Sequence, residues 1–81
     1  MRELIIDCSH FSGTDLDMEI VGWATAVYGY PEVFLPMDDS EGWQWEADQA
    51  LEFLNDEEYK NGRYFEIEDN CLFRVTGEED E

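Results

Sequence analysis

Basic residues are scarce in this chain of 81 residues, which has four lysine and arginine side chains and one histidine against 22 aspartates and glutamates. The formal net charge of −18 repels phosphate groups, so we expect no direct binding to nucleic acid or to an anionic membrane. Basic partners are attracted instead, and the most abundant strongly basic surfaces in a cell are those that bind nucleic acid. The composition therefore favours a basic, nucleic-acid-binding protein as the partner.

Other absences narrow the class of protein. Cys8 and Cys71 are the only cysteines, too few for a secreted disulfide scaffold, so we expect reduced thiols in the cytoplasm. A disulfide between them stays an alternative, because both lie in predicted strands that are potential neighbours. The first residues, MRELIIDC, lack the features of a signal peptide, and no segment approaches the length of a membrane span.

Groups for catalysis or metal binding are also few. Residues 7–10, DCSH, place a nucleophile, an acid and a base in sequence, but neighbouring residues of an extended chain point alternately apart. No zinc-type C-x-x-C spacing is present, and residues 56–62 do not match the spacing of a calcium loop. A glycine-rich phosphate loop is absent as well. We therefore predict a protein that is not an enzyme and has neither a cofactor nor a dedicated metal site.

The chain is nevertheless rich enough in apolar residues to fold. Hydrophobic residues make up 43% and aromatic residues 15%, more than is typical of a disordered acidic segment. We predict one globular domain over residues 1–77 and a frayed acidic tail over residues 78–81.

The hydrophobic pattern predicts an α+β fold in the order β-α-β-α-β-β. The first strand is expected over residues 3–8, and the first helix should begin at the N-cap Thr14 and end at Gly29. The apolar stripe of this helix is Leu16, Ile20, Trp23, Ala24 and Val27. Residues 32–36, EVFLP, predict a short second strand, and a right-handed crossover if it is the parallel neighbour of the first.

A second helix is expected over about residues 41–55, capped by Asp39 or Ser40. Its apolar stripe is Trp43, Ala47, Ala50, Leu51 and Leu54. The chain then ends in a hairpin, for which we predict a three-residue loop at residues 68–70 with Asn70 in the left-handed conformation. Both helices should pack on one face of a three- or four-stranded sheet that ends in this C-terminal hairpin.

The acids are concentrated in the second half of the chain. Residues 38–81 hold sixteen acids against three bases, whereas residues 1–37 hold six acids against one base. The predicted register turns Glu66 and Glu68 outward, about 6.6–6.8 Å apart. Asp48 and Glu52 are one helical turn apart, about 6 Å, on one face of the second helix. These intervals are close to those of successive phosphates along a nucleic-acid strand; an ordinary solvated face is the alternative.

Aromatic side chains among these acids complete the candidate surface. An indole at the centre of an acidic helix face is not expected in the core of a monomer, and aromatic residues dominate interface hot spots. The predicted partner-binding residues are Asp38, Asp39, Trp45, Asp48, Glu52, Asp56, Glu57, Glu58, Tyr59, Tyr64, Glu66, Glu68 and Asp69.

In size, charge and mixture of aromatic with acidic residues, the whole chain resembles the small DNA-mimic inhibitors that phages and mobile elements use against host defence, such as anti-CRISPR and anti-restriction proteins. The resemblance implies a non-catalytic inhibitor in the cytoplasm of a bacterial host. Its target would be the basic nucleic-acid-binding surface of a CRISPR effector, a nuclease or a restriction enzyme. The alternative is an acidic interaction module (an antitoxin, adaptor or small subunit) with a mainly apolar contact, in which Trp45 and Tyr28 matter more than the acids. Trp45 then contacts either such a partner or a second copy of the chain in a homodimer.

Overall fold

A computed structural model describes residues 1–77, so the predicted tail over residues 78–81 lies outside the described residues. The elements are β1 (Arg2–Asp7), α1 (Gly13–Trp23), the π-helical turn η1 (Ala24–Tyr28), α2 (Ser40–Tyr59), β2 (Arg63–Glu68) and β3 (Cys71–Thr76). Within residues 1–77, no helix combines the length and the apolar character needed to cross a membrane.

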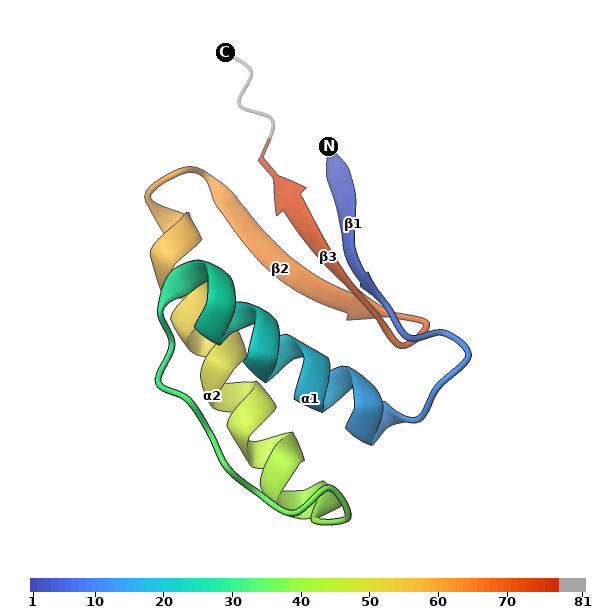
Figure 1. Cartoon of the computed structure of the whole chain (residues 1–81). Helices are drawn as coiled ribbons and strands as arrows, with labels where there is room; N and C mark the ends of the chain where they lie inside the picture. Colours follow the sequence, from blue (N-terminus) through green and yellow to red (C-terminus); the bar gives the residue numbers. More distant parts are fainter. Residues whose placement is uncertain (78–81) are drawn as a thin grey trace.

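β3 is the central strand of a three-stranded antiparallel sheet with the order β1-β3-β2. Both helices pack on one face of this sheet, and no described element covers the other face (Figure 1). The largest fully buried side chains, Ile20, Leu54 and Leu72, come from α1, α2 and β3, so the core lies between the helices and the sheet. The predicted α+β fold, with two helices on one face of a sheet that ends in a C-terminal hairpin, is confirmed.

α1 begins earlier than predicted, because its N-cap is Ser12 and not Thr14. The Ser12 hydroxyl accepts the Asp15 N–H and the Asp15 carboxylate accepts the Ser12 N–H, both at 3.2 Å, which is a capping box. The helical path continues through η1 and ends at Gly29, whose φ of 78° is left-handed. In the predicted apolar stripe Leu16, Ile20 and Ala24 are buried, Trp23 is half-buried and Val27 is exposed.

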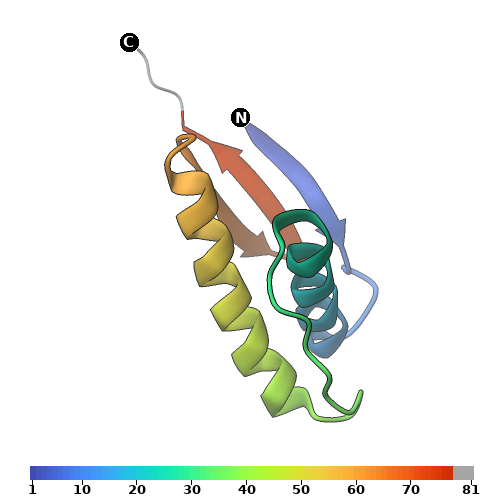
Figure 2. The same cartoon turned by 60° about the vertical axis from the view of Figure 1, so that its left-hand side comes forward.

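Residues 32–36 do not form the predicted second strand. The segment between η1 and α2 pairs with no strand of the described residues and runs along the helices on the side away from the sheet (Figures 1 and 2). Val33 and Leu35 pack against the core, whereas Phe34 is 83% exposed. The alternation that predicted a strand therefore reflects packing on helices, and the described residues contain no parallel strand pair.

α2 is capped by Asp39, one of the two predicted caps, whose carboxylate accepts the Gly42 N–H at 3.1 Å. Trp43, Ala47, Ala50 and Leu54 are buried, as predicted, and Leu51 is half-buried. The helix continues to Tyr59, past the predicted end near residue 55. This extra turn places Glu58 in the buried stripe, because it follows Leu54 by four residues.

The predicted three-residue hairpin loop is wrong. Glu68 pairs with Cys71, and only Asp69 and Asn70 turn the chain, with φ values of 54° and 58°. Two successive positive φ values are typical of the two-residue type I′ turn, whose twist matches that of the strands. Apolar side chains consequently lie on both faces of the sheet, because Leu72 faces the helices and its neighbour Phe73 faces the uncovered side.

Contacts outside the hairpin hold this turn in place. The side-chain amide nitrogen of Asn70 lies 2.7, 3.0 and 3.1 Å from the backbone oxygens of Cys8, Phe11 and Ser12. The Cys8 N–H also donates to the Asn70 carbonyl at 3.2 Å. The turn is therefore fixed to the loop between β1 and α1, a tertiary constraint that the hairpin sequence alone does not contain.

Replacing Asn70 with glycine separates turn preference from tertiary bonding. Glycine adopts positive φ more readily than asparagine, so turn chemistry alone predicts no loss of stability. We expect Asn70→Gly to lower the free energy of unfolding by about 1–3 kcal/mol, because the backbone oxygens of the β1–α1 loop lose their donor. Asp69→Gly is the matched control and should change it by less than about 0.5 kcal/mol. Urea unfolding measures both, and equal small changes would show that the Asn70 contacts do not stabilise the fold.

Candidate functional site

One face of α2 carries acidic and aromatic side chains and faces solvent. Its positions recur every three or four residues, so they share one side of the helix, opposite the buried stripe that contains Leu54. We call this face the acidic stripe, and its members are Glu41, Trp45, Asp48, Glu52, Asp56 and Tyr59. All six are exposed, Trp45 to 60% and Tyr59 to 83%.

Five of the predicted partner-binding residues therefore lie on one exposed helix face. Asp48, Glu52 and Asp56 follow one another at steps of four residues, about 6 Å along the helix axis for each step. No ion pair within residues 1–77 involves any of these three carboxylates. Trp45 precedes the row and Tyr59 follows it, so an aromatic side chain flanks the row at each end.

Asp17 of α1 extends the negative charge beyond α2. Burial raises the pKa of this half-buried carboxyl above its usual range, and the nearby Asp48 carboxylate raises it further. Sequence reasoning missed Asp17, because its place in the first turn of α1 was fully explained by the helix dipole. Its proximity to Asp48 depends on the packing of the two helices.

No lysine or arginine side chain forms an ion pair with the acidic stripe within residues 1–77, although Lys60 directly follows Tyr59. Residues 3–59 contain neither lysine nor arginine. The ion pairs are Arg2 with Glu66 and Glu68, Lys60 with Glu57, Arg63 with Glu58, and Arg74 with Glu3 and Glu58. Three of these cations thus lie on the strands and Lys60 lies just past the end of α2, and within residues 1–77 none of them pairs with the row of α2.

Glu66 and Glu68 do not form the free acidic row that the sequence predicted. Both bind Arg2, whose Nε is 3.3 Å from a Glu66 carboxylate oxygen and whose Nη2 donates to Glu68. The Arg2 guanidinium also lies 3.8 Å from the centre of the Phe73 ring. Arg2 reaches both acids because β1 and β2 flank the same strand. The hairpin face, which also carries the half-exposed Tyr64, is partly neutralised and is separate from the acidic stripe.

Glu58 is wrong as a partner-binding residue, because its side chain is buried. Its carboxylate accepts hydrogen bonds from the Tyr28 hydroxyl, from Arg63 Nε at 2.7 Å and from Asn61 Nδ2 at 3.2 Å, and Arg74 Nη1 is 3.7 Å away. Burial raises the pKa of Glu58, but the hydrogen bonds from Tyr28, Arg63 and Asn61 outweigh burial and hold that pKa below its usual range. The ionised carboxylate therefore joins α2 to η1 and to the sheet.

The remaining predicted residues have mixed positions. Asp38 is exposed just before α2, whereas Asp39 serves as the N-cap of that helix. Glu57 is half-buried and lies 3.9 Å from Lys60, and Asp69 is exposed in the hairpin turn. Asp38 is therefore the one residue of these four that lies just before the acidic stripe and takes part in neither a helix cap nor an ion pair within residues 1–77.

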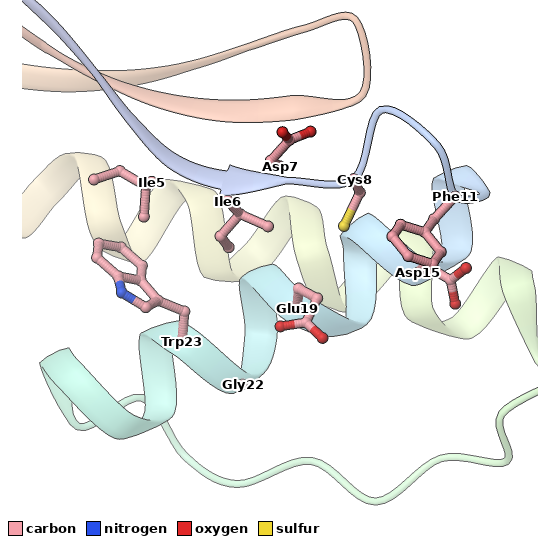
Figure 3. Close-up of a pocket in the computed structure, with 9 residues that line it drawn as sticks. All are labelled: Ile5, Ile6, Asp7, Cys8, Phe11, Asp15, Glu19, Gly22 and Trp23. Carbon is pink, nitrogen blue, oxygen red and sulfur yellow. The ribbon is translucent and has the colours of Figure 1, made fainter.

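The DCSH segment is not assembled as a catalytic site. Asp7 Oδ1 accepts hydrogen bonds from the Ser9 N–H at 3.1 Å and from the Ser9 hydroxyl at 2.8 Å. The carboxylate is therefore bonded to its own loop and not to Cys8 or His10. Burial raises the pKa of the Cys8 thiol, so it is a poor nucleophile. Cys8 and Cys71 are free thiols; β1 pairs Asp7 with Cys71, and Asp7 and Cys8 point to opposite sides (Figure 3). Among residues 1–77, no three histidine, cysteine or acidic side chains are grouped as metal ligands.

Comparisons with known proteins found no match to this chain, whether to a protein-family model, to a curated protein or to a solved structure. No relative therefore assigns a role to the acidic stripe. Its function has to be inferred from its own charge, exposure and contacts.

Asp48→Asn tests whether α1 and α2 share one negative field. The substitution removes the like charge beside Asp17, so we expect the pKa of Asp17 to fall toward its usual range, while the effect of burial stays. At neutral pH the loss of repulsion should also raise the free energy of unfolding by about 0.5 kcal/mol. Glu52→Gln, on the same stripe, is the control and should leave Asp17 unchanged. Carbon-13 NMR titration of the carboxyl groups measures this, and an Asp17 pKa that is the same in both variants would contradict the shared field.

Proposed function

We propose that this protein is a non-catalytic inhibitor that presents the acidic stripe of α2 to the basic nucleic-acid-binding surface of another protein. The observation that carries this proposal is the row of Asp48, Glu52 and Asp56, which is exposed and, within residues 1–77, has no side-chain cation paired with it. Surfaces that bind nucleic acid hold successive phosphates with lysine and arginine. Carboxylates spaced about 6 Å apart along a helix can occupy the same contacts and displace the nucleic acid.

The target class follows from the resemblance to DNA-mimic inhibitors. That resemblance points to a host defence protein in the bacterial cytoplasm, and a CRISPR effector is the first target to test, followed by nucleases and restriction enzymes. Such a protein has a channel lined with lysine and arginine, which matches the charge of the acidic stripe in sign. Electrostatic steering would make association fast and strongly dependent on salt concentration.

The rigidity of α2 supports this role. Asp39 caps its first turn, and Glu58 fixes its last turn to η1 and the sheet. A row of charges that is already held in place loses little conformational entropy when it binds. Trp45 and Tyr59 add apolar area at the two ends of the row, and residues of these types are enriched in interface hot spots.

The second candidate is an acidic interaction module, an antitoxin, adaptor or small subunit, that binds its partner mainly through apolar contacts. The observation that favours it is the exposure of large apolar side chains outside the sheet: Phe34 is 83%, Met37 76% and Trp45 60% exposed. Such a contact would depend on these side chains more than on the carboxylates, and added salt would weaken it little.

Charge reversal on the acidic stripe tests the inhibitor proposal. Fluorescent duplex DNA bound to purified CRISPR effectors, nucleases and restriction enzymes serves as the probe, and displacement of the DNA is the measurement. We expect Glu52→Lys to weaken displacement about tenfold or more, because one attractive contact becomes repulsive. Glu32→Lys, an exposed acid outside the stripe with the same change in net charge, should weaken it less than about threefold.

The salt response of the same assay separates the two candidates. The inhibitor should lose about tenfold or more of its affinity between low and physiological salt, and Trp45→Ala should weaken it only moderately. Equal effects of Glu52→Lys and Glu32→Lys would show that net charge alone acts, which contradicts a defined stripe. Affinity that is insensitive to salt and lost in Trp45→Ala would favour the interaction module.

A further inference from the structure

A groove lies between β1 and the adjoining face of α1, on a different part of the molecule from the acidic stripe (Figure 3). Its volume is about 810 Å³, within the range of sites that bind ligands or side chains. Ile5 and Ile6 line it from β1, and Trp23 lines it from α1. Trp23 is fixed by edge-on contacts with the Tyr28 and Phe65 rings, at 5.3 and 5.7 Å between ring centres.

A β-bulge creates the apolar wall of this groove. The pairing of β1 with β3 shifts between Leu4 and Ile6, so Ile5 is an extra residue in the strand. Without the shift, Ile5 and Ile6 would point to opposite faces of the sheet. With it, both side chains point toward α1 (Figure 3). Both remain only half-buried, because no side chain of the described residues fills the groove between them and solvent.

Gly22 keeps the groove open on the side of α1. It is the next-to-last residue of α1, within a helical path that continues through η1, and glycine destabilises a helix relative to alanine. A Cβ atom at this position would meet no atom within 4 Å, so the fold itself does not require glycine there. Neither a positive φ nor a close backbone approach explains the residue. The glycine is accounted for if another molecule brings a side chain against this part of α1.

The rim of the groove is acidic. Glu19 is exposed on α1, and Asp15, whose carboxylate also caps the helix, lies one turn before it; the Asp7 side chain points away from the groove (Figure 3). No ion pair within residues 1–77 involves Glu19 or Asp15. An apolar floor with an acidic rim is complementary to an apolar side chain flanked by lysine or arginine.

The edge of β1 beside the groove is open to an additional strand. β1 is an edge strand, and no described strand pairs with its outer side. The backbone nitrogen and carbonyl oxygen of the first residue both bond to Thr76 of β3. In an antiparallel pair, every second residue directs its backbone groups toward the partner strand, so the N–H and carbonyl of Leu4 point away from β3. The other edge strand, β2, is different, because its Phe65 N–H donates to Asn55 of α2 at 2.7 Å. An extended segment can therefore add to the sheet at β1.

We propose that this groove binds an extended segment of a partner protein. One apolar side chain of the segment lies over Gly22, between Ile6 and Trp23, and a basic side chain two residues along the segment lies against Glu19. The backbone of the segment pairs with the outer edge of β1 at Leu4. This proposal does not rest on the acidic stripe and stands or falls separately from the inhibitor proposal.

A capped seven-residue peptide with leucine at its centre, lysine two residues to either side and threonine elsewhere is the probe. In an extended peptide these three side chains share one face. We expect the peptide to shift the NMR signals of Ile5, Ile6, Gly22 and the Trp23 indole, and to slow hydrogen exchange of the Leu4 amide. Peptides with serine for the leucine, or glutamate for the lysines, should bind at least tenfold more weakly.

Two substitutions at Gly22 give a matched pair. Gly22→Ala should raise the melting temperature and leave the affinity for the lysine peptide within about threefold, because a methyl group leaves the groove open. Gly22→Leu should fold, because the space around Gly22 is empty, and should reduce the affinity at least tenfold because its side chain fills the groove. Glu19→Lys should also weaken binding of the lysine peptide, and Glu52→Lys should not.

Three results would overturn the proposal. One is the absence of shifts at the groove residues when the lysine peptide is present at millimolar concentration. The second is equal affinity of Gly22→Leu and Gly22→Ala. The third is binding that Glu52→Lys weakens as strongly as Glu19→Lys, because the peptide would then be attracted by net charge and not by the groove. None of these results bears on displacement of DNA, so failure here leaves the inhibitor proposal to its own assay.

Discussion

Only four side-chain cations offset the mutual repulsion of 22 carboxylates. Their positions determine which elements are joined by ion pairs and which faces stay negatively charged. Arg63 and Arg74 converge on the buried carboxylate of Glu58, which joins the end of α2 to η1 and the sheet. Arg2 links β1 to two acids of β2 across the Phe73 ring. Exposed ion pairs contribute little free energy, whereas removing a partner from the Glu58 cluster would leave a buried charge unpaired, so the loss of this cluster would be the most destabilising. Because every cation lies on a strand or just past the end of α2, the outer face of α2 carries uncompensated negative charge.

This division of charge gives the molecule two surfaces with different chemistry. The acidic stripe contains a row of three carboxylates between two aromatic side chains, with charges of the sign that a phosphate-binding surface attracts. The groove beside β1 is mainly apolar, acidic only at its rim, and suited to an extended chain. The two lie on different elements, so one molecule has room to use both. An inhibitor that binds a large basic protein would gain specificity from a second, apolar contact, because charge alone discriminates poorly among basic surfaces.

The fold class could be predicted from hydrophobic periodicity, because the apolar stripes of both helices and the strand character of the terminal segments are local features. Leu54 and Ile20 are buried as their spacing predicted. The strand over residues 32–36 was wrong, because alternating burial against helices gives the same pattern as a half-buried strand. The hairpin register was wrong, because the two-residue turn leaves apolar side chains on both faces of the sheet, with Arg2 over Phe73 on the uncovered face. Asn70 is in addition held by a loop about sixty residues away in the sequence.

The candidate site was predicted in part for similar reasons. Helix periodicity predicted the face that carries Trp45, Asp48 and Glu52, and all three side chains are exposed. Asp56 and Tyr59 join this face because α2 is one turn longer than predicted. Glu58 could have been recognised as buried if the period had been continued one turn past Leu54. The neutralisation of Glu66 and Glu68 could not, because it requires the strand order that brings Arg2 beside them. The place of Gly22 beside a groove could not be predicted from the sequence, because it depends on the empty space around this residue in the fold.

We infer that negative potential is concentrated on the outer face of α2 and is reduced on the uncovered face of the sheet. Paramagnetic relaxation of each backbone amide, compared between a cationic and a neutral nitroxide of similar size, reports the local potential directly. We expect the largest ratio of cationic to neutral relaxation at the amides of Asp48, Glu52 and Asp56, and a markedly smaller ratio at Glu66, Glu68 and Phe73. Equal ratios on α2 and on β2 would contradict it, because the cations would then not divide the surface as their ion pairs imply.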